Sequence, residues 1–330
     1  MKTLSVIMPV YNAAPFIGTT IGDLLSQTLK DLEIIAVDDG STDGTGELLD
    51  GLARKDGRIR VIHRQNGGAP SARNAGLDHA EGRYVGFTDS DDRVDPEMYE
   101  RMVAAAEKTG ADVVSCGFVQ EYSDKIGIVP HHEENVGPIV FEGRRDCLDS
   151  IEERSGSVAT YTWNKIIRKD LIGSLRFCED MRITDDLIFI YHLFEKAEKV
   201  VNIRIPFYHY RYTLSGLTKA SRAEVYLHEL ERIDELIEWS AEHAPHCREK
   251  LIRRYLFWNT KGCESMLRDS DGGIYRQFRS NIRKYAQYIG SLKPRRRILV
   301  RAAKTAWWTY KIAGEVNLTL KKLFVKTRNG

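Results

Sequence analysis

The sequence predicts an α/β fold, with a largely parallel sheet flanked by helices and a helical extension at the C-terminal end. Two observations predict the sheet. Short apolar runs alternate with amphipathic stretches through the first third of the chain, which is the pattern of repeated βαβ units. Polar and acidic clusters directly follow several of these runs, where ligands bind in such sheets. A third observation predicts the extension, because apolar residues recur at helical spacing from Ser221 onward.

The predicted elements alternate as far as Cys116. In chain order they are strand Leu4–Val10, helix Phe16–Leu29, strand Leu32–Val37, helix Thr45–Arg54, strand Ile59–Ile62, helix Ser71–Ala80, strand Tyr84–Phe87, a helix beginning at Pro96, and strand Asp112–Cys116. Each strand is a short and mostly apolar run, whereas the first helix carries its apolar residues at helical spacing. Pro96 suits the first turn of a helix, where a backbone donor has no partner to lose.

The pattern changes after Cys116. Residues 122–158 are polar and predict irregular structure, and they precede the segments "YTWNKIIRKDL", "RFCEDMRITDDLIFIYHLFEKA" and "IPFYHYRY". A length of 330 residues suggests two domains. We place the boundary near residue 220, with halves 1–115 and 116–220 in the first domain and a helical region, 221–330, after it.

Charge is nearly balanced over the whole chain, with 49 Lys and Arg against 47 Asp and Glu, but it is unevenly distributed. Residues 294–330 contain ten basic residues and one acidic residue, a net charge of +9. Basic residues mixed with aromatic and aliphatic ones favour an anionic membrane surface as partner. The alternative is a C-terminal helix packed on the body. No nucleic-acid recognition module is apparent, so nucleic acid is not an expected partner.

The remaining composition indicates a cytoplasmic protein, either free of the membrane or peripheral at the inner face of the cell membrane. The five cysteines form no CxxC pair, which favours reduced thiols over a zinc ribbon or a disulfide framework. The chain enters a strand-like run without signal-peptide features, and no apolar run approaches the ~18 residues of a spanning helix.

Acidic side chains follow the strand Tyr84–Phe87 in the segment "TDSDD". Carboxylates packed this closely repel one another, and burial increases the repulsion. Asp89 and Asp91 are separated by one residue, so their oxygens can converge on one divalent cation, and such hard ligands suit Mg²⁺ or Mn²⁺. The alternative is an exposed turn before the helix at Pro96.

Two further segments follow strands of the predicted sheet. In "NGGAPSARNAG", adjacent glycines, a helix start and Arg73 offer amide donors and a guanidinium to an anionic group. In "VDDGSTDGTGELLD", five residues also match the spacing of a calcium loop: Asp39, Ser41, Asp43, Gly44 and Asp50. A capped turn explains this segment better, because "LEIIAV" before it is no entering helix.

These segments together carry a family resemblance. The ordered set "SVIMPVYNAAPFI", "VDDGSTDGT", "NGGAPSARNAG", "FTDSDD", "WNKIIRKDL" and "TDDLIF" resembles the inverting family 2 glycosyltransferases with the GT-A fold, a Rossmann-like type of sheet. The resemblance covers about residues 3–215. It implies a divalent cation, Mn²⁺ or Mg²⁺, and a nucleotide-sugar donor, most simply a UDP-sugar. The implied acceptor is a saccharide or lipid-linked molecule, in cell-surface polysaccharide or glycoconjugate synthesis.

The resemblance also implies roles for residues. The catalytic base would be Asp186, although Asp185 stands where the family usually has Glu. The residues implied at the nucleotide are Pro9, Val10, Tyr11, Asp39, Arg73 and Asp89. The residues implied at the metal are Asp91 as direct ligand, Asp89 and His209. The residues implied at the donor sugar or acceptor are Ser90, Asp92, Trp163, Asn164, Lys165, Asp185 and Arg211. For Trp163 and His209, ordinary packing is an alternative.

The predicted activity is therefore a metal-dependent, inverting hexosyltransferase reaction. A carboxylate takes the proton of the acceptor hydroxyl, and a cation stabilises the leaving diphosphate. The alternative is a nucleotide- or saccharide-binding module without catalysis. A dinucleotide oxidoreductase is disfavoured, because "PVYNAAP" and not a GxGxxG motif follows the first strand.

Overall fold

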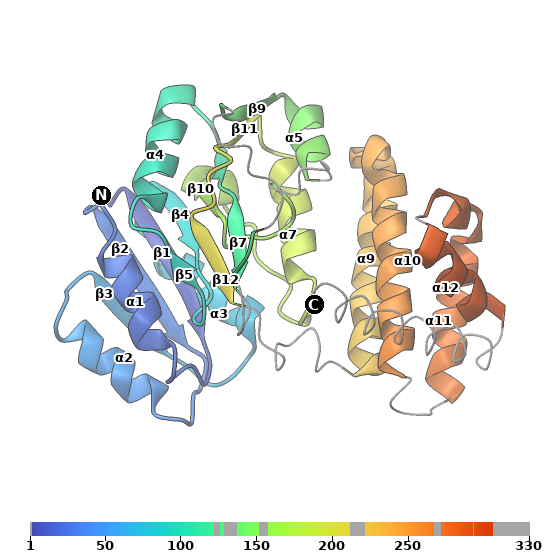
Figure 1. Ribbon diagram of the computed structural model, residues 1–330, viewed down its shortest axis with the longest axis horizontal. Coiled ribbons are helices and arrows are strands. Elements are labelled where there is room, and N and C mark those ends of the chain that lie inside the picture. Colours follow the sequence, from blue (N-terminus) through green and yellow to red (C-terminus); the bar gives the residue numbers. More distant parts are fainter. Residues whose placement is uncertain are drawn as a thin grey trace. The chain divides into compact units, whose positions relative to one another are not determined.

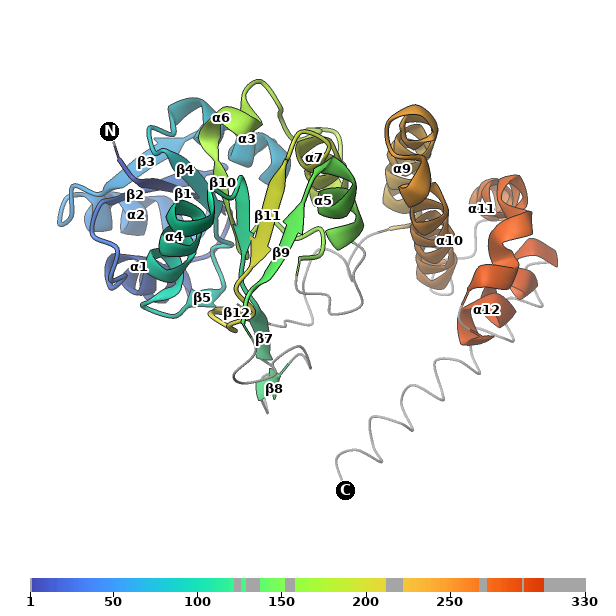
Figure 2. The ribbon, with the colours of Figure 1, turned by 90° about the horizontal axis from the view of Figure 1, so that it is seen from above.

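The computed structural model describes residues 2–121, 126–128, 137–151, 158–211, 222–266, 272–292 and 294–305. The chain forms two compact units, Met1–Gly216 and Leu217–Gly330. Figures 1 and 2 show the elements of both units. In the described part of the chain, no helix combines the length and the apolar character needed to cross a bilayer.

An eight-stranded sheet forms the centre of the first unit. Its strands, in spatial order, are β3 (Ile59–His63), β2 (Leu32–Asp38), β1 (Leu4–Val10), β4 (Tyr84–Phe87), β10 (Lys165–Arg168), β6 (Val113–Ser115), β11 (Lys199–Asn202) and β9 (Ile139–Glu142). The first four strands are mutually parallel, whereas β10 and β9 run antiparallel to their neighbours. The predicted α/β class with a largely parallel sheet is therefore confirmed.

Helices cover both faces of this sheet, as Figure 2 shows. On one face lie α1 (Ile17–Leu25) and α4 (Met98–Thr109). Their apolar side chains share one buried cluster with Val6 and Met8 of β1. On the other face lie α3 (Ala69–His79) and α7 (Asp185–Phe194). Gly76 lets α3 approach the sheet closely, because a Cβ there would lie 2.3 Å from Ile7 Cγ2. Helix α2 (Thr45–Ala53) follows β2, and α6 (Lys169–Ile172) follows β10.

A second, four-stranded sheet lies beside the first. Its order is β5 (Arg93–Val94), β12 (Tyr208–Arg211), β7 (Phe118–Glu121) and β8 (Ile126–Ile128). The expectation of irregular structure over residues 122–158 was wrong in its described parts, which contain β8, β9 and α5 (Arg144–Ser150). Strand β9 lies at the sheet edge and none of its described side chains is fully buried, so its sequence carries little apolar signal.

The second unit is helical, as the sequence predicts. Its elements are α9 (Ala223–His243), η1 (Pro245–Cys247), α10 (Arg248–Ser265), α11 (Gly272–Lys284), η2 (Ala286–Ser291) and α12 (Pro294–Thr305). Gly262 permits close packing of α10 on α11, because a Cβ there would lie 2.4 Å from the Phe278 ring. Helix α12 buries Leu299 and Val300, which matches the alternative of a packed helix for this part of the basic tail. Residues 306–330 lie outside the described residues.

Candidate functional site

The candidate site lies at the carboxyl ends of β1, β2 and β4, where parallel sheets bind ligands. Hydrogen bonds join the segments after β1 and β2. The Asn12 amide donates to Ser41 Oγ (3.0 Å), and the Thr42 amide donates to Asn12 Oδ1 (2.8 Å). Tyr11 is 54% exposed, whereas Val10 beside it is buried. The loop after β1 therefore exposes the Tyr11 ring, close to Pro9, and hydrogen bonds to the segment after β2 hold the backbone of this loop.

Asp39 is buried and binds the glycine segment before α3. The Gly67 and Gly68 amides donate to its carboxylate at 2.7–3.1 Å, and Arg64 Nε lies 3.2 Å from Asp39 Oδ1. The glycine amides were expected to bind an anionic group, and in this structure that group is the Asp39 carboxylate. The structure gives the calcium-loop alternative no support, because strand β2 and not a helix leads into this segment. Asp43 instead accepts from Thr45, and Asp50 contacts His63.

The acid motif after β4 has partly buried members, Asp89 and Asp91, and one fully buried member, Asp92. Asp92 is 1% exposed; its carboxylate accepts from the Tyr208 hydroxyl and the Arg211 amide, each at 2.7 Å. Burial, then the charges of Asp89 and Asp91, raise the pKa of Asp92 well above its usual range. These contacts fasten the motif to β12. The predicted contact of Asp92 with donor or acceptor stays a prediction.

Asp91 has the electrostatic setting of a cation ligand. Burial, followed by the charge of Asp89, raises the pKa of Asp91 to about 6, and Arg211 opposes this shift. Among the described residues, no side chain forms a salt bridge with Asp91 within 4.0 Å, although Asp89 pairs with Arg73. Two hard carboxylates that repel each other at a strand end fit Mg²⁺ or Mn²⁺, which would cancel the repulsion. Ser90 lies between them.

Arg73 joins acids that are far apart in the sequence. Its guanidinium contacts Asp185 at 2.7 Å, Asp89 at 3.3 Å and Asp186 at 3.6 Å. Arg73 is buried, and its guanidinium carbon lies 5.5 Å from the centre of the Phe177 ring. Within the described part of the chain, its Nε has no hydrogen-bond partner. The sequence predicts Arg73 at the nucleotide. The structure places it between the acid motif and the predicted base.

Asp186 has the environment of a general base. It lies in the first turn of α7, and its side chain is 19% exposed. Burial raises the pKa of Asp186 to about 7; Arg73 opposes the shift, whereas Asp185 and Asp89 add to it. The Thr162 hydroxyl lies 3.5 Å from Asp186 Oδ1. A carboxylate that titrates near neutral pH is suited to accept a proton under ordinary conditions.

Lys165 and Asn164 are buried beneath the site, on β10 and the turn before it. Lys165 Nζ donates to the Val158 carbonyl, to the Tyr161 carbonyl (2.5 Å) and to Asn164 Oδ1 (2.8 Å). Asn164 Nδ2 donates to the Cys116 carbonyl at 2.8 Å. Burial lowers the pKa of Lys165 to about 7, and the charge of Asp186 opposes this shift. Both side chains are 0% exposed, and their hydrogen bonds hold the turn before β10. Their predicted contact with donor or acceptor stays a prediction.

Trp163 is also largely buried, at 5% exposure, which matches its packing alternative. Its ring stacks with Tyr161 and with Tyr208, at centroid distances of 4.7 and 4.3 Å. Tyr161, in contrast, is 39% exposed. The solvent-facing aromatic ring of this segment is therefore the one two residues earlier in the chain.

His209 and Arg211 lie on β12 but have different surroundings. His209 Nδ1 lies 2.9 Å from Glu121 and Nε2 lies 3.2 Å from Asp95, so both ring nitrogens face carboxylates outside the acid motif. Neighbouring residues of a strand point to opposite faces, and Tyr208 is the one that reaches Asp92. This placement gives the metal-ligand prediction for His209 no support. The Arg211 guanidinium lies over the Phe16 ring, 4.9 Å from its centre. Its charge also opposes the rise in the pKa of Asp91.

Sequence reasoning missed several residues that hold the site together. Tyr208 donates to Asp92 and accepts from the Asp89 amide at 3.2 Å. Glu179 accepts from Ser71 Oγ at 2.7 Å and from Asn74 Nδ2 at 2.9 Å, which ties α3 to the segment before α7. The two adjacent acids in "RFCED" were only a weak signal that Glu179 has a role. Nothing in the sequence distinguished Tyr208 from the aromatic residues around it.

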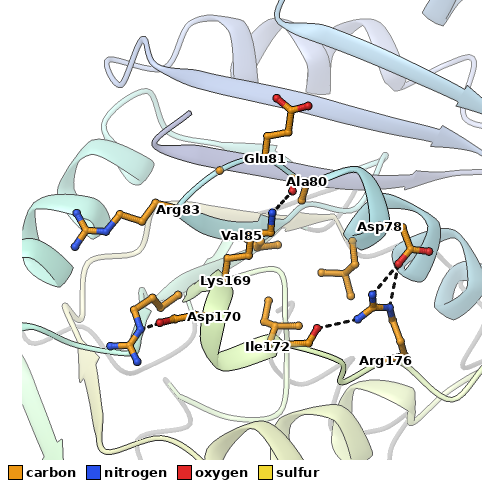
Figure 3. Close-up of a pocket in the computed structure, with 13 residues that line it drawn as sticks. Asp78, Ala80, Glu81, Arg83, Val85, Lys169, Asp170, Ile172 and Arg176 are labelled. Carbon is orange, nitrogen blue, oxygen red and sulfur yellow. Dashed lines mark hydrogen bonds and ion pairs between the residues drawn. The ribbon is translucent and has the colours of Figure 1, made fainter. Parts of the chain in front are cut away.

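A cavity of about 890 Å³ lies at the opposite edge of the main sheet, where β4 begins and β10 ends. Figure 3 shows Lys169 reaching the Ala80 carbonyl and Arg176 reaching Asp78, at 2.5 and 2.7 Å. The basic side chains around it, Arg83 and Arg168 included, are thus paired with acids or carbonyl groups. The cavity is distinct from the candidate site.

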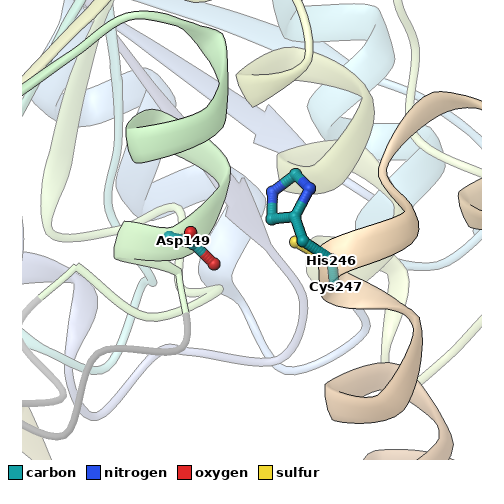
Figure 4. Close-up of side chains that lie close together, drawn as sticks. All are labelled: Asp149, His246 and Cys247. Atoms are coloured by element: carbon teal, nitrogen blue, oxygen red, sulfur yellow. The ribbon is translucent and has the colours of Figure 1, made fainter.

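Figure 4 draws Asp149 of α5, in the first unit, and His246 with Cys247 of η1, in the second. Asp149 has Arg145 as a neighbour at 4.0 Å, and Cys247 is a buried thiol. Because each unit is described by itself, no site is assigned to these three residues.

Comparisons with known proteins agree with this arrangement. Residues 5–172 match the family model "Glycosyl transferase family 2". The chain is 39% identical over 218 residues to "Uncharacterized glycosyltransferase EpsJ" of Bacillus subtilis, covering 66% of this chain and 63% of that protein. It is 26% identical over 309 residues to "Minor teichoic acid biosynthesis protein GgaB" of the same organism, covering 86% of this chain but 32% of GgaB.

A solved structure shows the same fold. TarS residues 1–349 of S. aureus, in complex with UDP-GlcNAc, superimpose with a TM-score of 0.69 and 19% identity. The superposition covers 97% of this chain and 92% of that one. The predicted GT-A type of fold is therefore confirmed.

Proposed function

The chain belongs to glycosyltransferase family 2, and from this premise we propose that it moves a sugar from a UDP-sugar to an acceptor hydroxyl with inversion. One observation carries the proposal: Arg73 brings Asp89 of the acid motif together with Asp185, which lies 112 positions further along the sequence than Arg73, and with the adjacent Asp186. This arrangement puts a candidate base beside a candidate cation site at the ligand-binding edge of the sheet. The crystal of TarS with UDP-GlcNAc supports the choice of a UDP-sugar.

Inverting transfer is a single displacement at the anomeric carbon. Asp186 takes the proton of the acceptor hydroxyl. At the same time, the hydroxyl oxygen of the acceptor forms a bond to the anomeric carbon, and the bond from that carbon to the nucleotide diphosphate breaks. Arg73 and the first turn of α7 favour the ionised form of Asp186, against the burial that raises its pKa to about 7, so the base is ionised above that pH. A divalent cation held by Asp91 and Asp89 would offset negative charge on the departing diphosphate.

The nucleotide belongs, in this proposal, at the ends of β1 and β2. Tyr11 offers an exposed aromatic face to the base, beside Pro9, Val10 and Asp39. Arg211, close enough to affect Asp91, offers a cation to the diphosphate. We place the acceptor on the side of Asp186. The relationship to GgaB, named for minor teichoic acid biosynthesis, supports an acceptor in surface polymer synthesis.

A donor screen tests this function. With Mn²⁺, a UDP-sugar should raise the melting temperature, since a ligand at about 100 times its Kd adds about 2.7 kcal/mol of stability. UDP release should follow when an acceptor is added. GDP- and dTDP-sugars serve as matched donors, and EDTA as the metal control. If no nucleotide sugar stabilises the chain, the proposal fails; if one binds but is never consumed, the chain is a binding module.

We also propose that residues beyond α12 associate with an anionic membrane at its cytoplasmic face. Residues 306–330 contain five Lys and Arg and one Glu. Each basic residue near such a surface contributes about 1 kcal/mol, screened by salt. The full chain should sediment with phosphatidylglycerol vesicles at low salt, and a chain ending at Thr305, which keeps α12, should not. Equal sedimentation of both chains would contradict this.

A further inference from the structure

Five aromatic rings form one cluster beside the acid motif: Phe118, Tyr161, Trp163, Tyr208 and Tyr210. Trp163 lies at its centre, stacked with Tyr161 at an interplanar angle of 16° and with Tyr208 at 23°. Trp163 and Tyr208 are 5% and 0% exposed, so neither ring has a face to offer a ligand. Tyr161 is the most exposed of the five, at 39%.

Contacts hold Tyr161 in place. Its ring lies parallel to Trp163 and meets the Phe118 ring at 82°, with a centroid distance of 5.7 Å. Its carbonyl oxygen accepts a hydrogen bond from the buried Lys165 ammonium at 2.5 Å. A ring whose orientation is fixed by packing loses little conformational freedom when a ligand binds.

Residues next to Tyr161, along the chain and in the aromatic cluster, interact with both acidic groups of the site. The next residue, Thr162, directs its hydroxyl to Asp186 at 3.5 Å. On the other side, burial raises the pKa of Tyr210, and the charges of Asp92, Asp89 and Asp91, followed by that of Tyr161, add to this shift. The segment that carries the exposed ring therefore also contacts the candidate base, where the proposed function places the acceptor hydroxyl.

We propose that the face of Tyr161 binds the pyranose ring of the acceptor, so that the acceptor is a cyclic sugar and not an open-chain polyol phosphate. A pyranose presents a flat face of C–H groups, whose partial positive charge matches the negative face of an aromatic ring. An open-chain polyol has no such face and would need cations or hydrogen-bond donors instead. This inference rests on the proposed function, because it places the acceptor at Asp186.

Saturation-transfer NMR and binding titrations in the presence of UDP and Mn²⁺ test the inference. The probes are methyl pyranosides of glucose, galactose and N-acetylglucosamine, with ribitol phosphate and glycerol phosphate as open-chain competitors. Tyr161→Ala should weaken pyranoside binding about three- to tenfold. Tyr161→Phe keeps the aromatic face and should stay within about twofold of the wild type. Leu48→Ala, a matched loss of an exposed apolar side chain on α2, should have no effect.

The two proposals fail in different ways. If UDP and UDP-sugars do not bind to the wild type, the proposed function falls. If they bind normally, but no pyranoside binds, or Tyr161→Ala leaves pyranoside binding unchanged, the Tyr161 assignment is overturned alone. Preferential binding of ribitol or glycerol phosphate would likewise overturn it. An unchanged Kd for UDP in Tyr161→Ala, with an unchanged melting temperature, would show that any loss is confined to the acceptor.

Discussion

Replacement of Asp186 by asparagine is expected to lower the rate of sugar transfer by about 10²–10⁴-fold, the usual contribution of a positioned general base. Asparagine keeps the size and the hydrogen bond with Thr162, but it cannot take the acceptor proton. The Kd for the UDP-sugar should change less than about threefold, because the proposed nucleotide contacts lie on β1, β2 and the acid motif. Initial rates and donor titrations measure the two effects separately.

The pH dependence gives the same prediction a second readout. Burial raises the pKa of Asp186 to about 7 in the folded protein, so the ionised base is present above that pH and is lost as the pH falls through it. For the wild type, kcat/KM should therefore rise from pH 6 to pH 8 and then level off. The residual activity of Asp186→Asn should lack this rise.

A matched control separates the loss of a base from the loss of a charge. Asp170→Asn removes a largely exposed carboxylate at the far edge of the sheet, where Asp170 pairs with Arg168, and it should leave transfer unchanged. Asp185→Asn removes the closest partner of Arg73 and should mainly lower stability. Asp186 is not the base if Asp186→Asn transfers sugar within about threefold of the wild-type rate.

Local sequence pattern predicted the first half of the main sheet well. The bounds of β1 and β4 coincide with the predicted runs Leu4–Val10 and Tyr84–Phe87, because buried parallel strands are continuous apolar runs. The first helix ends at Leu25, before the predicted end at Leu29. Gln27 lies beyond that end, where its side chain contacts the Asp95 carbonyl and the Tyr99 amide. The spacing of apolar residues could not predict this helix end, because the contacts of Gln27 are with residues far away in the sequence.

The sequence predicted where the acidic residues lie at the strand ends. It did not predict which residues contact them. The sequence pattern placed Asp39 and the pair Asp89 and Asp91 at the carboxyl ends of two strands, and the structure has them directly after β2 and β4. The contacts of Arg73 with Asp185 and Asp186 depend on the packing of α3 beside α7, which the sequence does not specify. Likewise, the burial of Lys165 follows from the position of β10 between β4 and β6.

Replacement of Asp91 by asparagine is expected to abolish the stabilisation that Mn²⁺ gives in the presence of UDP, and to lower kcat/KM by on the order of a hundredfold or more. The amide oxygen is a weaker ligand, and Asp89 already pairs with Arg73. Melting curves with and without Mn²⁺ and UDP measure the first effect, and steady-state rates the second.

The metal-free protein provides the internal control for Asp91→Asn. Burial, followed by the charge of Asp89, raises the pKa of Asp91 from 3.8 to about 6 in the folded protein, so ionisation of Asp91 costs stability that grows between these two values and is complete above about pH 6. Asparagine removes this cost, and at pH 8 the metal-free variant should melt no lower than the wild type. A damaged fold would lower both melting temperatures, whereas a lost cation ligand removes only the response to Mn²⁺. If Asp91→Asn keeps the full response to Mn²⁺ and UDP, the cation is held elsewhere and the acid motif serves only to fasten β12 through Asp92 and Tyr208.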